Sequence, residues 1–132
     1  FDEQISLATR FDLPLIIHSV QATEDVTDLL KSHSKSRGVI HAYSGSIQQA
    51  ENLLKINFSF GFGNALTNPQ AYKLHDIVKF LPIESIVIET DDHKNPDELI
   101  QVAERVARIK KLTVDQVIDQ CDENTRNIFN ID

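Results

Sequence analysis

The sequence predicts an α/β fold built from parallel β/α units. Four short apolar runs end in polar residues, and they alternate with longer segments whose apolar residues recur at helical spacing. This alternation is typical of parallel strands that are joined by right-handed helical crossovers. The 132 residues suit one domain, and no linker or repeat divides them. We therefore expect residues 1–132 to form a single α/β unit.

The first elements follow from periodicity and from local breakers. Apolar residues at helical spacing over 1–8 predict an opening helix, which Pro14 stops. The branched run 15–17 is typical of a strand that is covered on both faces, and it ends in His18. Thr23 is a favourable N-cap for the second helix, which gives way to a serine-rich polar stretch.

The middle of the chain repeats this order. A second strand at 39–40 runs into His41, and a capping box of Ser46 with Gln49 begins the third helix. Residues 58–62 alternate at period two and predict a third strand, whose glycine allows another group to approach closely.

The last elements use the same signals. Asn68 before Pro69 predicts the N-cap and first turn of a fourth helix. Residues 86–88 predict the fourth strand, with polar residues at its exit. Asn95 before Pro96 predicts the start of the longest amphipathic helix. A capping box of Thr113 with Gln116 follows, and a short helix around Ile128 and Phe129 closes the chain.

Composition excludes several classes of protein. The 20 acidic and 13 basic residues give a net charge of −7, which argues against a broad basic surface for nucleic acid. The 41% hydrophobic and 25% charged fractions are typical of a soluble globular domain, and no apolar run approaches a membrane span, so we expect a cytoplasmic protein. Cys121 is the single cysteine, so an internal disulfide or a cysteine-based zinc site is excluded. Because the sequence contains no Met, we expect it to be a piece of a longer or processed protein.

Candidate metal ligands lie where three predicted strands end. Functional sites of parallel α/β folds lie at the carboxyl ends of the strands, and His18, His41 and Asp91 are all at that edge. Two imidazoles and a carboxylate suit Zn²⁺, Mn²⁺ or a similar ion. Taken alone, either histidine could instead hydrogen-bond a neighbouring loop. Asp91 and Asp92 could likewise be part of the segment that leads into the next helix, with no role in metal binding. Their common placement favours the metal site.

The other histidines and the cysteine carry weaker signals. His93 shares a loop with Asp91, so we expect it to contact substrate. His33 lies in a polar stretch and His75 on a helix face, where solvation is the simpler explanation. Cys121 is expected to be a small buried apolar residue.

Three motifs together carry a family resemblance. The segments PLIIHS at 14–19, GVIHAYSGS at 38–46 and IETD at 88–91, in this order, resemble the TatD family of metal-dependent deoxyribonucleases. The resemblance covers essentially the whole chain. It implies a TIM-type (β/α)₈ barrel of the metallo-dependent hydrolase kind, which cleaves phosphodiester bonds of DNA with one or two divalent ions, Zn, Mg or Mn.

The resemblance also implies roles for individual residues. His18, His41 and Asp91 resemble the metal ligands of the fifth, sixth and eighth barrel strands, with Asp91 also catalytic. Ser44 and His93 are the implied substrate contacts. Two positions depart from the family: Val20 stands where an arginine is frequent, and the loop between Asp91 and Asn95 is shorter than usual. Val20 removes a candidate phosphate-binding group, and the shortened loop is expected to alter the substrate rim and with it the preference for DNA.

The family's remaining metal ligands, a His-x-His and a glutamate from earlier strands, have no counterpart in this sequence. Because a barrel takes about 250 residues, we expect residues 1–132 to be the C-terminal half of such a hydrolase. The alternative is a non-catalytic half-barrel module that pairs with a second copy or with a partner and binds through its strand-end face. Under either hypothesis we expect the exposed sheet edges to favour self-association into a homo-oligomer. A flavodoxin-like nucleotide domain is less consistent, because residues 19–22 lack a glycine-rich phosphate loop.

Overall fold

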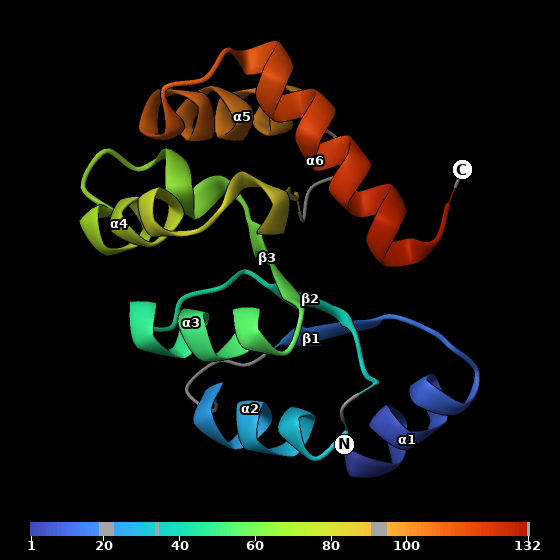
Figure 1. Cartoon of the computed structure of the whole chain (residues 1–132). Coiled ribbons are helices and arrows are strands. Elements are labelled where there is room, and N and C mark those ends of the chain that lie inside the picture. Colours follow the sequence, from blue (N-terminus) through green and yellow to red (C-terminus); the bar gives the residue numbers. More distant parts are fainter. Residues whose placement is uncertain (19–22, 34, 91–94, 132) are drawn as a thin grey trace.

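The strands of the chain form one parallel sheet with helices between them (Figure 1). The computed structural model describes residues 1–18, 23–33, 35–90 and 95–131. Within these residues the strands pair in chain order and are β1 (Leu15–His18), β2 (Gly38–His41), β3 (Phe58–Phe62) and β4 (Ile86–Ile88). The α-helices are α1 (Asp2–Arg10), α2 (Thr23–Lys31), α3 (Ile47–Lys55), α4 (Tyr72–Phe80), α5 (Asp97–Lys110) and α6 (Val114–Phe129). The predicted α/β architecture is confirmed.

The register gives the two faces of the sheet different roles. Ile17 pairs with Ile40, Ile40 with Phe60, and Phe60 with Ile86, so these side chains share one face. All four are buried in the main hydrophobic core. The residues between them, among which are His18 and His41, point to the opposite face. One face therefore builds the core and the other carries the candidate site.

Helices α2, α3, α4 and α5 are stacked in chain order beside the sheet (Figure 1). Helix α6 packs against α5, β4 and the short 3₁₀-helix η2 (Ile83–Ser85). Buried Asn124 ties α6 to this region, because its side-chain amide donates to the carbonyls of Ile83 and Ile86, each at 2.8 Å. Within the described residues, no helix is long and apolar enough to span a membrane.

Both predicted capping boxes are present. The Ser46 hydroxyl accepts a hydrogen bond from the Gln49 amide at 3.1 Å, and the Gln49 side-chain oxygen accepts one from the Ser46 amide at 2.9 Å. Thr113 and Gln116 make the same pair of bonds. The helix that Thr113 begins continues without a break to Phe129 and ends at Asn130, which has a left-handed φ of 55°. The prediction of a separate short helix around Ile128 was therefore wrong.

Two predicted helix starts were also wrong. A 3₁₀-helix, η1 (Asn64–Thr67), precedes Asn68, whose side-chain oxygen accepts from the Gln70 amide at 2.9 Å. This local bond makes a turn in place of a helical N-cap, and α4 begins only at Tyr72. Helix α5 begins at Asp97, with Pro96 at its N-cap position.

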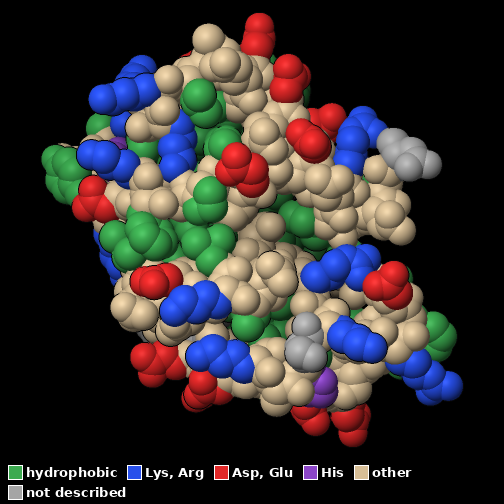
Figure 2. Space-filling view, viewed as in Figure 1, with side chains coloured by type: hydrophobic (Ala, Val, Ile, Leu, Met, Phe, Trp, Pro, Cys, Tyr) green, Lys and Arg blue, Asp and Glu red, His purple; other side chains and the backbone are tan. Residues whose placement is uncertain are grey.

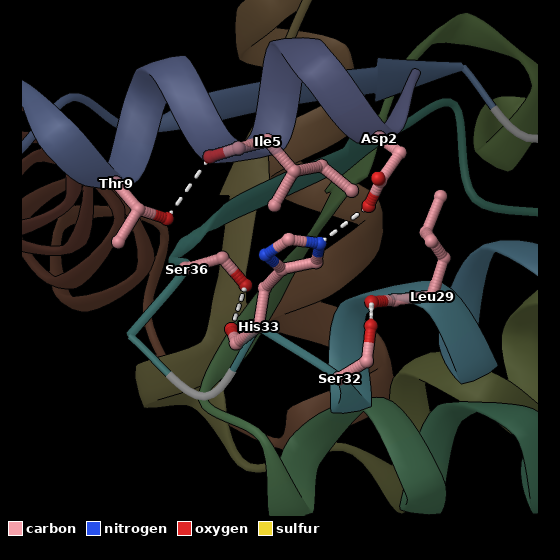
Figure 3. A network of polar contacts seen from close by, with 7 residues as sticks. All are labelled: Asp2, Ile5, Thr9, Leu29, Ser32, His33 and Ser36. Carbon is pink, nitrogen blue, oxygen red and sulfur yellow. Dashed lines mark hydrogen bonds and ion pairs between the residues drawn. The ribbon is translucent and has the colours of Figure 1, made fainter.

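His33 connects the first helix to the segment that follows α2 (Figure 3). Its Nε2 lies 2.6 Å from the Asp2 carboxylate, and its carbonyl accepts from the Ser36 hydroxyl at 2.7 Å. His75 Nε2 likewise lies 3.0 Å from the Leu66 carbonyl. Both histidines are only partly exposed, which corrects the expectation that they are solvated. Their hydrogen bonds give them structural roles.

Candidate functional site

His18 and His41 lie side by side at the carboxyl edge of the sheet. They are register partners at the ends of β1 and β2, and their ring centroids are 4.2 Å apart with an interplanar angle of 66°. His18 is exposed, whereas the His41 side chain is 15% exposed. The two imidazoles are thus in contact, as their positions at the strand ends predicted.

Glu89, the residue directly after β4, contacts this pair through His41. Its amide donates to the Phe62 carbonyl at 3.0 Å, which extends the β3–β4 pairing by one step. Two residues after Val87, the Glu89 side chain falls on the same face as His41. Its Oε2 lies 2.7 Å from His41 Nδ1, and its Oε1 accepts from the Ala42 amide at 2.6 Å. One carboxylate therefore contacts both the ring of His41 and the backbone of the next residue.

Gly61 provides the space that this carboxylate occupies. A Cβ at position 61 would lie 2.4 Å from Glu89 Oε2, which is far inside van der Waals contact. The prediction that a glycine in this strand admits a close approach is confirmed, and the approaching group is Glu89. The neighbouring Gly63 also faces Glu89, whose carbonyl would lie 3.2 Å from an added Cβ.

The loop after β2 is held by hydrogen bonds at its start and end. Ala42 adopts a left-handed φ of 49°, a conformation that an alanine rarely takes without support. The Tyr43 amide donates to the Gly61 carbonyl at 3.0 Å, and its buried hydroxyl donates to the Ser46 carbonyl at 2.6 Å. Burial raises the Tyr43 pKa well above its usual value, because the buried position disfavours the charged phenolate.

A cavity of about 210 Å³ opens beside His41 and Glu89. Ser44, a predicted substrate contact, lines it and is exposed. The Lys73 ammonium reaches the same loop and donates to the Ser44 carbonyl at 3.3 Å. The remaining lining residues combine small and apolar side chains with a few polar ones, and they are Ala42, Tyr43, Gly61, Phe62, Gly63, Asn64, Ala65, Leu66, Leu74, Thr90 and Glu98.

Two predicted site residues, Asp91 and His93, lie outside the described residues. Within the described ranges, no group of three His, Cys, Asp or Glu side chains is placed to hold a metal ion. The histidine pair nevertheless fits a metal. Imidazole is a common ligand for transition metals, and a ligating histidine usually donates a hydrogen bond from its other ring nitrogen to a carboxylate or carbonyl. Such a carboxylate is present here, because Glu89 Oε2 lies 2.7 Å from His41 Nδ1.

Sequence reasoning missed Glu89 as a site residue. The available signal was its position, since it directly follows the fourth strand and lies two residues after Val87, an apolar residue of the same face. What the sequence alone does not give is the register that aligns β4 with β2 across β3.

The histidine pair lies at the carboxyl ends of parallel strands, which is where the active sites of TIM barrels lie. The family model for TatD related DNase matches residues 1–130. The chain belongs to the TatD family.

Curated relatives agree with this assignment. The chain is 32% identical to the uncharacterized metal-dependent hydrolase YjjV of Escherichia coli, over 98% of the chain and 55% of that protein. It is 33% identical to YabD of Bacillus subtilis, also an uncharacterized metal-dependent hydrolase, over 99% and 56%. The human 3'-5' RNA nuclease TATDN2 is 27% identical over 99% of the chain and 20% of its own length. The chain spans about half the length of the two bacterial relatives.

Solved structures show the same fold. The crystal structure of E. coli YjjV matches with a TM-score of 0.89 and 30% identity, covering 99% of the chain and 55% of that structure. A TatD family hydrolase from Entamoeba histolytica matches with a TM-score of 0.81 and 18% identity, over 96% and 54%. The second match supports the fold alone. Both agree with the predicted relation to a TIM-type barrel.

Proposed function

We propose that the chain is part of a divalent-metal-dependent hydrolase that cleaves phosphodiester bonds in nucleic acid. The observation that carries this proposal is the contact between His18 and His41, whose rings lie 4.2 Å apart at the carboxyl edge of the sheet. Family membership adds support, as do the relatives named metal-dependent hydrolases. DNA is the substrate that the sequence resemblance implies. Because one relative is named an RNA nuclease, RNA is the alternative substrate to test beside DNA.

In this proposal His18, His41 and Asp91 hold the metal. Two imidazoles favour zinc over magnesium, because magnesium prefers an all-oxygen shell. When bound, the ion would supply a water of lowered pKa and positive charge next to the phosphate. His41 enters the site with its Nδ1 held by Glu89, so its ring does not need to be ordered when the metal binds.

We place the part of the substrate that adjoins the scissile phosphate in the cavity beside His41. Ser44 offers a hydroxyl at its wall, and Lys73 brings a positive charge to the same loop. Basic and acidic side chains are interspersed on the face shown in Figure 2, in keeping with the net charge of −7. Local cations at the site, rather than a broad basic surface, would then hold the phosphates.

The proposal treats residues 1–132 as the C-terminal half of the complete hydrolase, with further metal ligands on the rest of the protein. The match to about half of each bacterial relative supports this division. The open sheet is consistent with it, since β1 and β4 are the edge strands among the described residues and Ile16 of β1 is 63% exposed.

Cleavage of matched oligonucleotides tests the proposal. The natural full-length protein, loaded in turn with Zn²⁺, Mn²⁺ or Mg²⁺, is incubated with end-labelled single-stranded DNA and RNA of the same sequence. Metal-dependent cleavage is expected, and Asp91→Asn and His41→Ala should each lower the rate by at least about 100-fold. Exposed Asp97 provides the matched control, Asp97→Asn.

Two outcomes would overturn the proposal. One is cleavage that Asp91→Asn and His41→Ala leave unchanged, and the other is no cleavage by the metal-loaded protein. If, in the second case, the protein instead self-associates in a way that substitutions on the exposed edge of β1 disrupt, the non-catalytic module becomes the better description. Sedimentation velocity measures that association.

A further inference from the structure

We infer that Glu89 is a positioning residue that selects the nitrogen His41 offers to a metal. The inference deepens the proposed function and rests on it only in treating His41 as a ligand. It starts from the two contacts of one carboxylate, to His41 Nδ1 at 2.7 Å and to the Ala42 amide at 2.6 Å.

The chemistry of the two groups sets the direction of the first contact. An ionised carboxylate accepts hydrogen bonds and donates none, so the proton between Glu89 and His41 belongs to Nδ1. A neutral imidazole with its proton on Nδ1 carries its lone pair on Nε2. Glu89 thus makes Nε2 the ligating nitrogen of His41, and it does so before any metal binds.

Burial strengthens this control. The side chains of His41 and Glu89 are only 15% and 18% exposed, and a hydrogen bond is electrostatically stronger away from bulk water. The Ala42 amide supplies a second donor to the same carboxylate, which holds the Glu89 side chain in one orientation. The ring of His41 is oriented through that fixed carboxylate.

The second contact extends the role of Glu89 to the loop after β2. Ala42 has a left-handed φ of 49°, and its amide bond to Glu89 stabilises that conformation. The loop that begins there contains Ser44 and borders the cavity. One side chain therefore sets both the histidine and the start of the loop that faces the proposed substrate.

The structure offers a matched control and an independent variant. Glu98 lines the same cavity and is partly buried, and its carboxylate accepts from the Thr90 hydroxyl at 2.8 Å. Glu98→Gln therefore removes the same charge nearby. Gly61→Ala keeps Glu89 but places a Cβ 2.4 Å from its carboxylate oxygen. Because that oxygen ends a flexible side chain, it can move away at little cost to the fold.

The first readout is the protonated ring nitrogen of His41 in the metal-free natural full-length protein. Long-range ¹H–¹⁵N spectra are recorded at a pH where the ring is neutral. The wild-type protein and Glu98→Gln should show His41 with its proton on Nδ1. Glu89→Gln and Gly61→Ala should show a mixture that includes the Nε2-protonated form. A wild-type His41 protonated on Nε2, or a tautomer that neither variant changes, would overturn the inference.

The second readout is the affinity for Zn²⁺ by calorimetry. Loss of a hydrogen-bonding partner behind a ligand typically costs about 10- to 100-fold in metal affinity, and we expect a loss in this range for Glu89→Gln with none for Glu98→Gln. An unchanged affinity in Glu89→Gln would overturn the positioning role, whatever the nuclease assay shows. Conversely, a protein that shows no nuclease activity could still have His41 protonated on Nδ1 by Glu89. The tautomer and affinity measurements therefore test the role of Glu89 independently of the cleavage assay.

Discussion

The ring of His18 lies edge to face against the ring of His41, with 4.2 Å between the centroids. The contact joins residues that are 23 positions apart in the sequence, since 41 − 18 = 23, and that occupy the same level of neighbouring parallel strands. Parallel pairing in this register brings the last residues of β1 and β2 together. The site is therefore a direct product of the sheet.

Loss of the exposed ring should weaken metal binding. His18→Ala removes a side chain that contributes nothing to the buried core, so the fold should be unaffected while the affinity for Zn²⁺ falls by at least about tenfold. Calorimetric titration measures the affinity. His33→Ala is the control, because His33 pairs with Asp2 at the first helix. Equal losses in the two variants would argue against a metal role for His18.

Gly38 should tolerate no side chain. It has a φ of 156°, and an added Cβ would lie 2.0 Å from the carbonyl oxygen of Leu15. That atom is backbone of the paired strand β1, so it cannot turn away as a side chain would. We expect Gly38→Ala to lower the free energy of unfolding by about 1–3 kcal/mol or more. Urea denaturation followed by circular dichroism provides the measurement, and a change below about 0.5 kcal/mol would contradict it.

Asn124 should contribute more to the free energy of unfolding than exposed polar residues of α6 do. It is 5% exposed and donates to the carbonyls of Ile83 and Ile86. Asn124→Ala leaves these acceptors without that donor, at a cost of about 1–3 kcal/mol. Exposed Asn127 lies on the same helix, and Asn127→Ala should stay within about 0.5 kcal/mol of the wild type. Thermal unfolding of both variants should separate them, and similar melting temperatures would contradict the structural role.

Cys121 should make the fold sensitive to alkaline pH. Burial raises the pKa of its thiol to about 11 from an ordinary value of 9.0. The unfolded chain therefore loses this proton before the folded chain does, so the contribution is complete below about pH 9 and is lost as the pH rises through about 11. Tyr43, whose pKa is also raised by burial, acts in the same direction.

Comparison with Cys121→Ala isolates the thiol. The difference in the free energy of unfolding between wild type and variant should shrink as the pH increases from about 9 to 11. A difference that stays constant over this range would show that the thiol does not control it. At neutral pH the thiol should react with a disulfide reagent only as fast as the protein unfolds, because it is buried and protonated.

The sheet and most helices were predictable because their signals are local. Branched apolar runs marked the strands, and the side-chain bonds of Ser46 and Thr113 to the third helical amide fixed two helix starts. Asn68 misled the prediction for a physical reason. The side-chain oxygen of an asparagine can cap a helix, but it can also accept from the amide two residues later and so form a turn. Asn68 forms this turn with the Gln70 amide.

The site was only partly predictable. Placement at strand ends was enough to predict that His18 and His41 meet. The role of Glu89 was not visible, since it depends on the register of β4 and on the space left by Gly61. The partners of His33 were equally hidden, because its contact to Asp2 spans 31 positions and depends on how α1 packs.

His18 and His41 should together hold a divalent metal at the carboxyl edge of this sheet. The most direct test is the metal content of the natural full-length protein purified without chelator, measured by mass spectrometry of the elements for wild type and for His18→Ala/His41→Ala. We predict bound divalent metal in the wild type and a large loss in the folded double variant. Equal metal content in the two folded proteins would show that these histidines do not hold it.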